Sequence, residues 1–163
     1  MFSVLVVVAC GRRKIWDVSP SAGAVSARDA YIGAPFRVNR RYAERFADRW
    51  VILSAKYGFI DPDFEIPENY NVTFKDPSTK PITVEELRKQ VLEKRLYEHP
   101  IVLVLGSRIY ARIVAEAFSG FDVKIKAPLA GLPIGKAMRK VKQALERGKP
   151  FDCDEVAENV HPS

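Results

Sequence analysis

Three short segments of this sequence combine basic residues, hydroxyl or thiol groups and glycine, and each follows an apolar run typical of a buried strand. The segments are Cys10-Gly11-Arg12-Arg13-Lys14, Ser54-Ala55-Lys56-Tyr57-Gly58 and Gly106-Ser107. In open parallel sheets, ligands bind in the crevice beyond the carboxyl ends of the strands. Cations and backbone N–H groups at that edge suit phosphate or another anion, so we expect an anion site there. The alternative is that glycine and serine only form turns and the basic residues are solvated.

The cysteine and the two histidines limit the chemistry available at such a site. Arg12, Arg13 and Lys14 could lower the pKa of the Cys10 thiol and make it a nucleophile, but no histidine is positioned to assist. We therefore expect Cys10 to serve in packing or ligand contact. His99 precedes the third apolar run, at the opposite end of the sheet, so a catalytic triad is not expected. No cluster has zinc spacing and the glycines match no dinucleotide or P-loop motif, so we expect neither metal nor cofactor.

A long proline-containing segment, residues 57–82, contributes the carboxylates nearest to these strand ends. Asp61 follows Ser54–Gly58 closely and is the candidate catalytic carboxylate, which could stabilise a developing cation on a sugar. Lys14 or Lys56 could then stabilise a departing nucleobase. A flat base would also need an aromatic partner, and the candidates are Tyr31, Tyr57 and Tyr70.

The distribution of charge favours an anionic partner. The net charge is +6, and residues 127–149 hold six basic residues against one acidic residue. Two helical patterns carry basic residues that could follow a phosphate backbone: Arg37, Arg41, Arg45, Lys136, Arg139 and Lys140. The rival explanation for the three arginines is local pairing with Glu44 and Asp48.

Alternation of apolar runs with helical patterns predicts the fold. Strands are expected at Val4–Ala9, Trp50–Leu53 and Ile101–Leu105, with a weaker one at Phe121–Ile125; helices are expected at Phe36–Ala47, Thr83–Tyr97, Ser107–Phe118 and Pro133–Arg147. The last helix should turn Ile134, Ala137, Met138, Val141 and Leu145 inward. The pattern predicts a three-layer α/β fold, with a mostly parallel central sheet of about four strands and helices on both faces.

Length and composition are those of one globular domain. The 163 residues fit a single domain over residues 1–150, followed by an acidic and poorly ordered tail, 151–163. The apolar N-terminal run is too short to cross a membrane and lacks the basic residues of a signal peptide. Two distant cysteines form no disulfide framework, so we expect a cytoplasmic protein.

Several blocks of the sequence resemble a family of small uncharacterised prokaryotic proteins. The blocks are Cys10–Lys14, Ala30–Gly33 with Phe36, Ile52–Pro62, Tyr70, and Leu129–Gly135. This resemblance implies that Gly33 and Gly131 also belong to the ligand site. The middle block is similar to one in the YaaA peroxide-stress family, which is reported to bind DNA. The chain also resembles, more distantly, the uracil-DNA-glycosylase-like α/β fold, without its water-activating motif or its C-terminal histidine motif.

Three functional classes therefore remain open at the level of the sequence. The first is a hydrolase acting at the N-glycosidic bond of a nucleobase in a nucleic acid or nucleotide. The second is a non-catalytic nucleic-acid-binding protein, and the third is a regulatory domain that binds a small nucleotide. The basic charge favours the first two classes.

Overall fold

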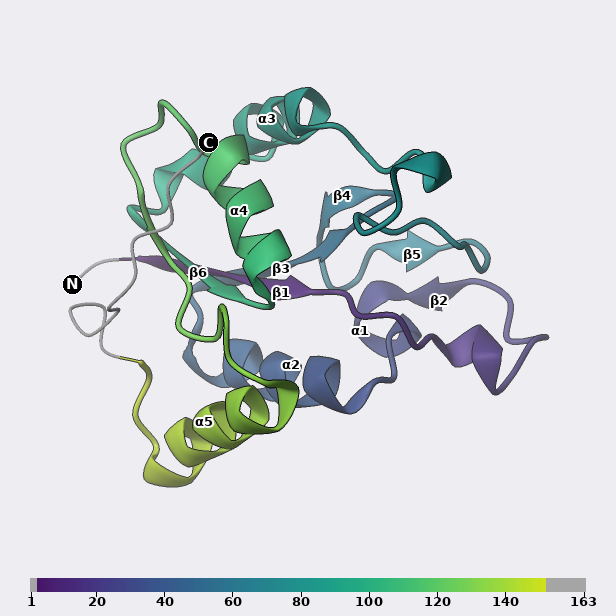
Figure 1. The fold of residues 1–163 in the computed structure, drawn as a ribbon, viewed down its shortest axis with the longest axis horizontal. Coiled ribbons are helices and arrows are strands. Elements are labelled where there is room, and N and C mark those ends of the chain that lie inside the picture. The colour runs from purple at the N-terminus through teal and green to yellow at the C-terminus, as the bar shows by residue number, and fades with distance from the viewer. Residues whose placement is uncertain (1–2, 152–163) are drawn as a thin grey trace.

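The computed structural model describes residues 3–151, which form a sheet covered by helices on both faces (Figure 1). The five-stranded sheet has the order β4-β3-β1-β6-β7, in which β4 alone is antiparallel to its neighbour. Its strands are β1 (Val4–Ala9), β3 (Arg49–Ser54), β4 (Gly58–Ile60), β6 (Ile101–Leu105) and β7 (Lys124–Lys126). The main helices are α2 (Ala34–Phe46), α3 (Val84–Glu93), α4 (Arg108–Ala117) and α5 (Ile134–Arg147). The predicted three-layer α/β fold is confirmed.

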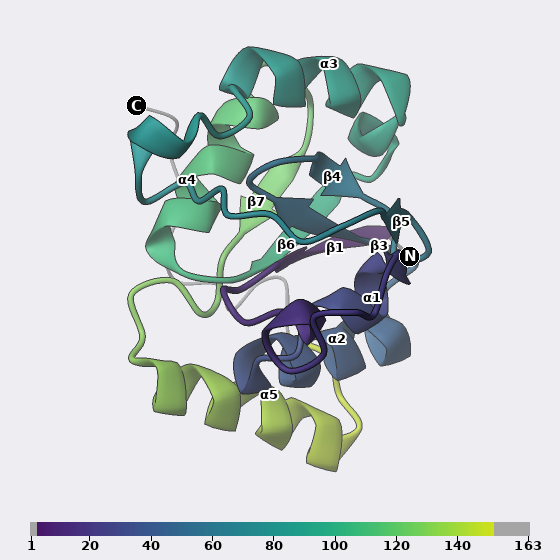
Figure 2. The ribbon, with the colours of Figure 1, turned by 90° about the vertical axis from the view of Figure 1, so that its right-hand side faces the viewer.

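Successive side chains of the central strand β1 enter two separate cores. Val6 and Val8 belong to the core under α2 and α5, whereas Leu5 and Val7 belong to the core under α3 and α4. Figure 2 shows α2 with α5 on one side of the sheet and α3 with α4 on the other. Burial on both faces explains why β1 and β6 are continuously apolar in sequence.

The predicted start of α3 and the predicted end of α5 are confirmed. Thr83 precedes α3, and its hydroxyl accepts a hydrogen bond from the backbone N–H of Glu86 at 3.1 Å. Gly148 ends α5 with φ +66°, a conformation that glycine adopts without strain. Ser107 occupies the N-cap position of α4, but its side chain makes no capping hydrogen bond.

Residues 57–82 differ most from the expected structure, because they are not an irregular loop throughout. They contain β4, the two-residue strand β5 (Glu65–Ile66) and a 3-10 turn at Pro77–Thr79. Strand β5 pairs with β2 (Val25–Ser26), which leads directly into the short helix α1 (Ala27–Ala30). The remaining 3-10 turns are Ile15–Asp17 and Leu96–Glu98.

Two further details of the prediction are wrong. The fourth predicted strand, Phe121–Ile125, begins later, at Lys124, because Phe121 instead stacks on Tyr97 with ring centres 5.6 Å apart. Ile134 does not point inward: it opens α5 and is 69% exposed.

Within residues 3–151 no helix is long and apolar enough to cross a membrane. All of the predicted tail except Phe151 lies outside the described residues.

Candidate ligand-binding site

The three strand ends singled out in the sequence meet at one edge of the sheet. Strands β3, β1 and β6 are parallel neighbours, so Cys10, Ser54 and Gly106 all follow carboxyl ends. The backbone N–H of Cys10 donates to the carbonyl of Leu53 at 3.3 Å. A Cβ on Gly106 would lie only 2.8 Å from that of Ala9, so the ends of β1 and β6 are in close contact.

A chain of hydroxyl groups fixes the long segment 57–82 over the end of β3. The fully buried Ser54 hydroxyl lies 2.8 Å from the Tyr70 hydroxyl, which in turn hydrogen-bonds to the Tyr31 hydroxyl. The Ser54 oxygen also accepts hydrogen bonds from the backbone N–H groups of Lys56 and Tyr57, both at 3.2 Å. Three predicted site residues, Tyr31, Ser54 and Tyr70, therefore form one buried network.

Burial keeps the acidic groups of this cluster neutral. Desolvation raises the pKa of the Cys10 thiol, and its contact with the Tyr110 hydroxyl, at 3.5 Å, offsets this only in part. Desolvation likewise raises the pKa values of Tyr31, Tyr70 and Tyr110. The cluster consequently presents neutral hydroxyl and thiol groups, and Cys10 has the character of a contact residue rather than of a nucleophilic thiolate.

Lys14 brings a positive charge into this neutral cluster. The residue is 9% exposed, and its ammonium lies 4.6 Å from the centre of the Tyr70 ring. The ammonium makes one hydrogen bond within residues 3–151, to the carbonyl of Arg12 at 3.4 Å, and no described carboxylate forms an ion pair with it. Asp17 accepts a hydrogen bond from the backbone N–H of Lys14, not from its ammonium. The Lys14 charge is thus held beside aromatic and hydroxyl groups.

The segment containing Gly33 lies beside the segment containing Lys14. Tyr31 and Lys14 form an isolated antiparallel bridge, and the backbone N–H of Ile32 donates to the carbonyl of Arg13 at 3.0 Å. Gly33 follows as the N-cap residue of α2. The grouping of Ala30–Gly33 with Cys10–Lys14, implied by the family resemblance, is therefore present in space.

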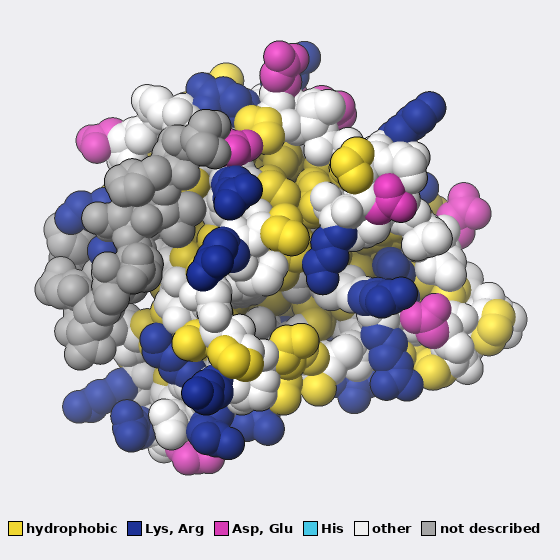
Figure 3. All heavy atoms as spheres, in the orientation of Figure 1, with side chains coloured by type: hydrophobic (Ala, Val, Ile, Leu, Met, Phe, Trp, Pro, Cys, Tyr) yellow, Lys and Arg dark blue, Asp and Glu magenta, His cyan; other side chains and the backbone are white. Residues whose placement is uncertain are grey.

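Exposed cations surround the cluster. Arg12, Arg13, Lys56 and Arg108 are exposed, and the Lys56 ammonium lies 5.3 Å from the centre of the Tyr57 ring. In Figure 3, dark blue side chains gather over the segment that follows β1. Gly131 lies against Arg108, because a Cβ there would be 2.7 Å from a guanidinium nitrogen. Arg108 is the first residue of α4 and follows Gly106 and Ser107 in the chain, so this contact places the predicted residue Gly131 beside that segment.

The structure places Asp61 away from these residues. Strand β4 runs antiparallel to β3, so the chain returns toward the start of β3 after Gly58. There the Asp61 carboxylate, 46% exposed, lies 3.4 Å from the guanidinium of Arg49. His99 also lies at the amino end of the sheet, where its Nδ1 is 2.7 Å from the Ser3 hydroxyl.

The six basic residues predicted to follow a phosphate backbone are all on α2 and α5. All six are exposed: Arg37, Arg41, Arg45, Lys136, Arg139 and Lys140. Two of them are engaged by the chain itself, because Arg45 donates to the carbonyl of Leu145 and Lys140 to that of Pro128. Glu44 pairs with Arg40 at 3.2 Å, and Asp48 accepts from the backbone N–H of Val4. The suggested pairing of the three arginines with these two acids is therefore wrong.

Tyr110 and Arg108 belong to the site but were missed in the sequence. Both lie in the first turn of α4, directly after the Gly106-Ser107 segment. Tyr110 contacts Cys10 and stacks edge-on against Phe74 of the long segment, with ring centres 5.6 Å apart. Including the first turn of the helix after each strand would have found both residues, since that turn also faces the crevice.

Comparison of the sequence with known proteins identifies its family, whose function is unknown. A family model described as a family of unknown function, DUF6884, matches residues 5–143. The uncharacterized protein YfjM of Bacillus subtilis (strain 168) is 41% identical over 143 residues, which cover 87% of this chain and 95% of the relative. No solved structure matches the chain. The chain belongs to the DUF6884 family, in agreement with the expectation of an uncharacterised family.

Proposed function

We propose that this protein binds a phosphate-bearing ligand, a nucleotide or a nucleotide within a nucleic acid, at the carboxyl ends of β1, β3 and β6, and does so in the cytoplasm. The observation that carries the proposal is the charge of Lys14, a residue that is only 9% exposed and has no carboxylate partner for its ammonium among residues 3–151. A buried charge is costly unless it is paired. An anionic ligand would supply the missing countercharge.

The groups around Lys14 also suit such a ligand. Neutral tyrosine hydroxyls can donate hydrogen bonds to phosphate oxygens, and the exposed residues Arg12, Lys56 and Arg108 add charge at the rim. Tyr57 is partly buried and offers a ring on which a base could stack. The similarity of the Ile52–Pro62 block to peroxide-stress proteins reported to bind DNA supports a ligand of the nucleotide class.

Binding is better supported than hydrolysis of an N-glycosidic bond. That reaction needs a carboxylate beside the sugar to stabilise the developing cation. Asp61, the carboxylate assigned to this role in the sequence, pairs with Arg49 at the far end of β3. The distant likeness to the uracil-DNA-glycosylase-like fold would bring an activity only if another carboxylate entered the site.

Calorimetric titration with inorganic phosphate, pyrophosphate and the four nucleoside monophosphates tests the proposal. The wild-type chain should bind at least one of these ligands, and Lys14→Met should weaken binding about 10-fold or more, because a charge-assisted hydrogen bond contributes roughly 1.5–3 kcal/mol. The matched control is Lys89→Met, since Lys89 is exposed on α3 and forms no hydrogen bond or ion pair within residues 3–151. Equal affinity of the wild type and Lys14→Met would overturn the proposal.

A further inference from the structure

Helices α2 and α5 enclose an open groove on the face of the sheet opposite α3 and α4. The groove has a volume of about 570 Å³ and is lined by Arg41, Glu44, Arg45, Lys142, Leu145 and Glu146. None of these residues belongs to the site around Lys14. The groove is thus a second surface whose chemistry can be considered separately.

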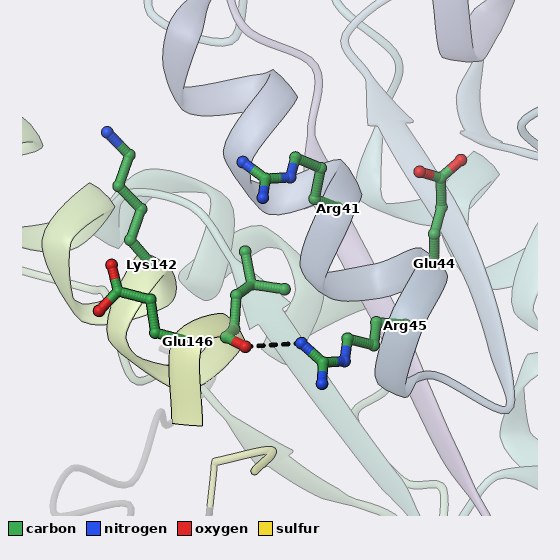
Figure 4. Close-up of a pocket in the computed structure, with 6 residues that line it drawn as sticks. Arg41, Glu44, Arg45, Lys142 and Glu146 are labelled. Atoms are coloured by element: carbon green, nitrogen blue, oxygen red, sulfur yellow. Dashed lines mark hydrogen bonds between the residues drawn. The ribbon is translucent and has the colours of Figure 1, made fainter. Parts of the chain in front are cut away.

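Each wall of the groove carries a cationic side chain that forms no ion pair within the described residues. Arg41 extends from α2 toward α5, and Lys142 stands on α5 across from it (Figure 4). Neither side chain makes a hydrogen bond or an ion pair within residues 3–151. Arg37 lies one turn before Arg41, and Arg139 lies one turn before Lys142, so each helix continues its row of cations.

The two acidic residues of the groove offset part of this charge, since three cations and two carboxylates line it. Glu44 is engaged by Arg40, whose Nε lies 3.2 Å from its carboxylate. Glu146 is the other groove acid, and it forms no ion pair within the described chain. Like charges four residues apart, such as Arg37 and Arg41, destabilise a helix slightly. An anion bound between them would offset this repulsion.

Arg45 has a structural role in this groove and should be removed from the set of phosphate contacts. Its guanidinium donates to the carbonyl of Leu145 at 2.6 Å (Figure 4). That carbonyl, in the last turn of α5, also accepts a hydrogen bond from the backbone N–H of Gly148. Lys140 is also engaged, because its ammonium donates to the carbonyl of Pro128 at 3.2 Å. Lys136 also has no partner among residues 3–151. The residues left for an external anion in the two rows that reach the groove are Arg37, Arg41, Arg139 and Lys142.

We infer that this groove binds the sugar-phosphate backbone of a nucleic-acid duplex through Arg37, Arg41, Arg139 and Lys142. Cations in rows on two packed helices can contact successive phosphates of such a backbone. Proteins that hold single strands add exposed aromatic rings on which bases stack. Among residues 3–151 the exposed aromatic side chains are Phe64 and Tyr97, and neither is on α2 or α5. The surface therefore fits a duplex better than a single strand.

The salt dependence of binding to a DNA duplex of random sequence tests this inference. Fluorescence anisotropy at a series of salt concentrations gives the slope of log K against log salt, about −0.9 for each phosphate contact. In the variant Arg41→Gln/Lys142→Gln the slope should become less steep by about 2. Arg45 is left intact, because it supports the end of α5.

The matched control is Lys89→Gln/Arg112→Gln, which removes the same charge from exposed positions on α3 and α4. We expect the control to keep the wild-type slope within about 1 unit. Phosphate and nucleoside monophosphate binding at the Lys14 site should be the same in both double variants, so the two proposals can fail separately. Absence of wild-type duplex binding at low salt, equal slopes in the two variants, or tighter binding of a single strand would each contradict the inference.

Discussion

At the scale of single residues, the site depends on a lysine charge placed among neutral hydroxyl groups. Lys14 contacts the ring of Tyr70, and the hydroxyl of Tyr70 joins those of Tyr31 and Ser54. Because burial raises the pKa values of both tyrosines, these hydroxyls stay protonated at neutral pH and cannot themselves neutralise the lysine.

The hydroxyl network makes a testable contribution to stability. Tyr70→Phe should lower the free energy of unfolding by about 1–2 kcal/mol, because it leaves buried hydroxyl groups of Tyr31 and Ser54 with fewer partners. The measurement is urea unfolding. Tyr57→Phe is the control, since the Tyr57 hydroxyl makes no hydrogen bond within residues 3–151, and it should change the stability by less than about 0.5 kcal/mol. Equal losses in the two variants would show that the network does not stabilise the fold.

Asp61 is expected to be dispensable for ligand binding. Its partially exposed pair with Arg49 should contribute only about 0–1 kcal/mol, so Asp61→Asn should fold normally. It should also keep wild-type affinity for the ligands that Lys14→Met binds more weakly. An assay of base release from duplexes with damaged bases checks the hydrolase alternative. If the wild type released a base and Asp61→Asn did not, Asp61 would be catalytic and our assignment of the site would be incomplete.

The strand-end rule explains which site residues could be predicted from the sequence. Cys10, Lys14 and Ser54 follow apolar runs that are unmistakable in sequence, and the structure brings them together. Asp61 seemed near them because it is only seven residues beyond Ser54. The intervening strand β4 reverses the chain, and three residues within a proline-containing segment give no periodic signal for it.

At the scale of elements, the close contact between β1 and β6 shapes the base of the site. Gly106→Ala would place a methyl group 2.8 Å from the Cβ of Ala9 and 3.2 Å from that of Tyr110, so strand or helix must shift. We expect a loss of about 1–3 kcal/mol in the free energy of unfolding, together with weaker ligand binding. Chemical denaturation and calorimetry measure the two effects.

Gly135→Ala provides the comparison, because Gly135 lies in the first turns of α5 with open space around it. It should raise stability by up to about 1 kcal/mol, since alanine favours a helix more than glycine does. A Gly106→Ala variant as stable as Gly135→Ala would mean that the two strand ends are not tightly packed.

Central strands were predicted more accurately than edge strands for a physical reason. Strands β1 and β6 are buried on both faces and have the predicted bounds, whereas the edge strand β7 has partly exposed lysines at both ends. In the predicted strand Phe121–Ile125, the aromatic residue packs against Tyr97 instead of pairing in the sheet. Apolar composition alone cannot tell an aromatic residue that packs on a neighbouring ring from one that belongs to a strand of the sheet.

At the scale of the whole molecule, positive charge is gathered at two places on different elements. One is the rim of the Lys14 site at the carboxyl edge of the sheet, and the other is the surface of α2 and α5 around the groove (Figure 4). The net charge of +6 in the sequence predicted an anionic partner but could not separate these surfaces, since that separation depends on how the helices pack.

The most direct test of the central claim is thermal unfolding of the wild type and Lys14→Met, each with and without phosphate and the four nucleoside monophosphates. Without ligand, Lys14→Met should unfold at the same temperature as the wild type or a higher one, because methionine fills the space without a buried charge. A ligand at about 100 times its wild-type Kd should stabilise the wild type by roughly 2.7 kcal/mol, and Lys14→Met, which binds about 10-fold more weakly or worse, by about 1.4 kcal/mol or less. A variant that is less stable without ligand yet gains as much from it as the wild type would contradict the claim that Lys14 is kept for an anionic ligand.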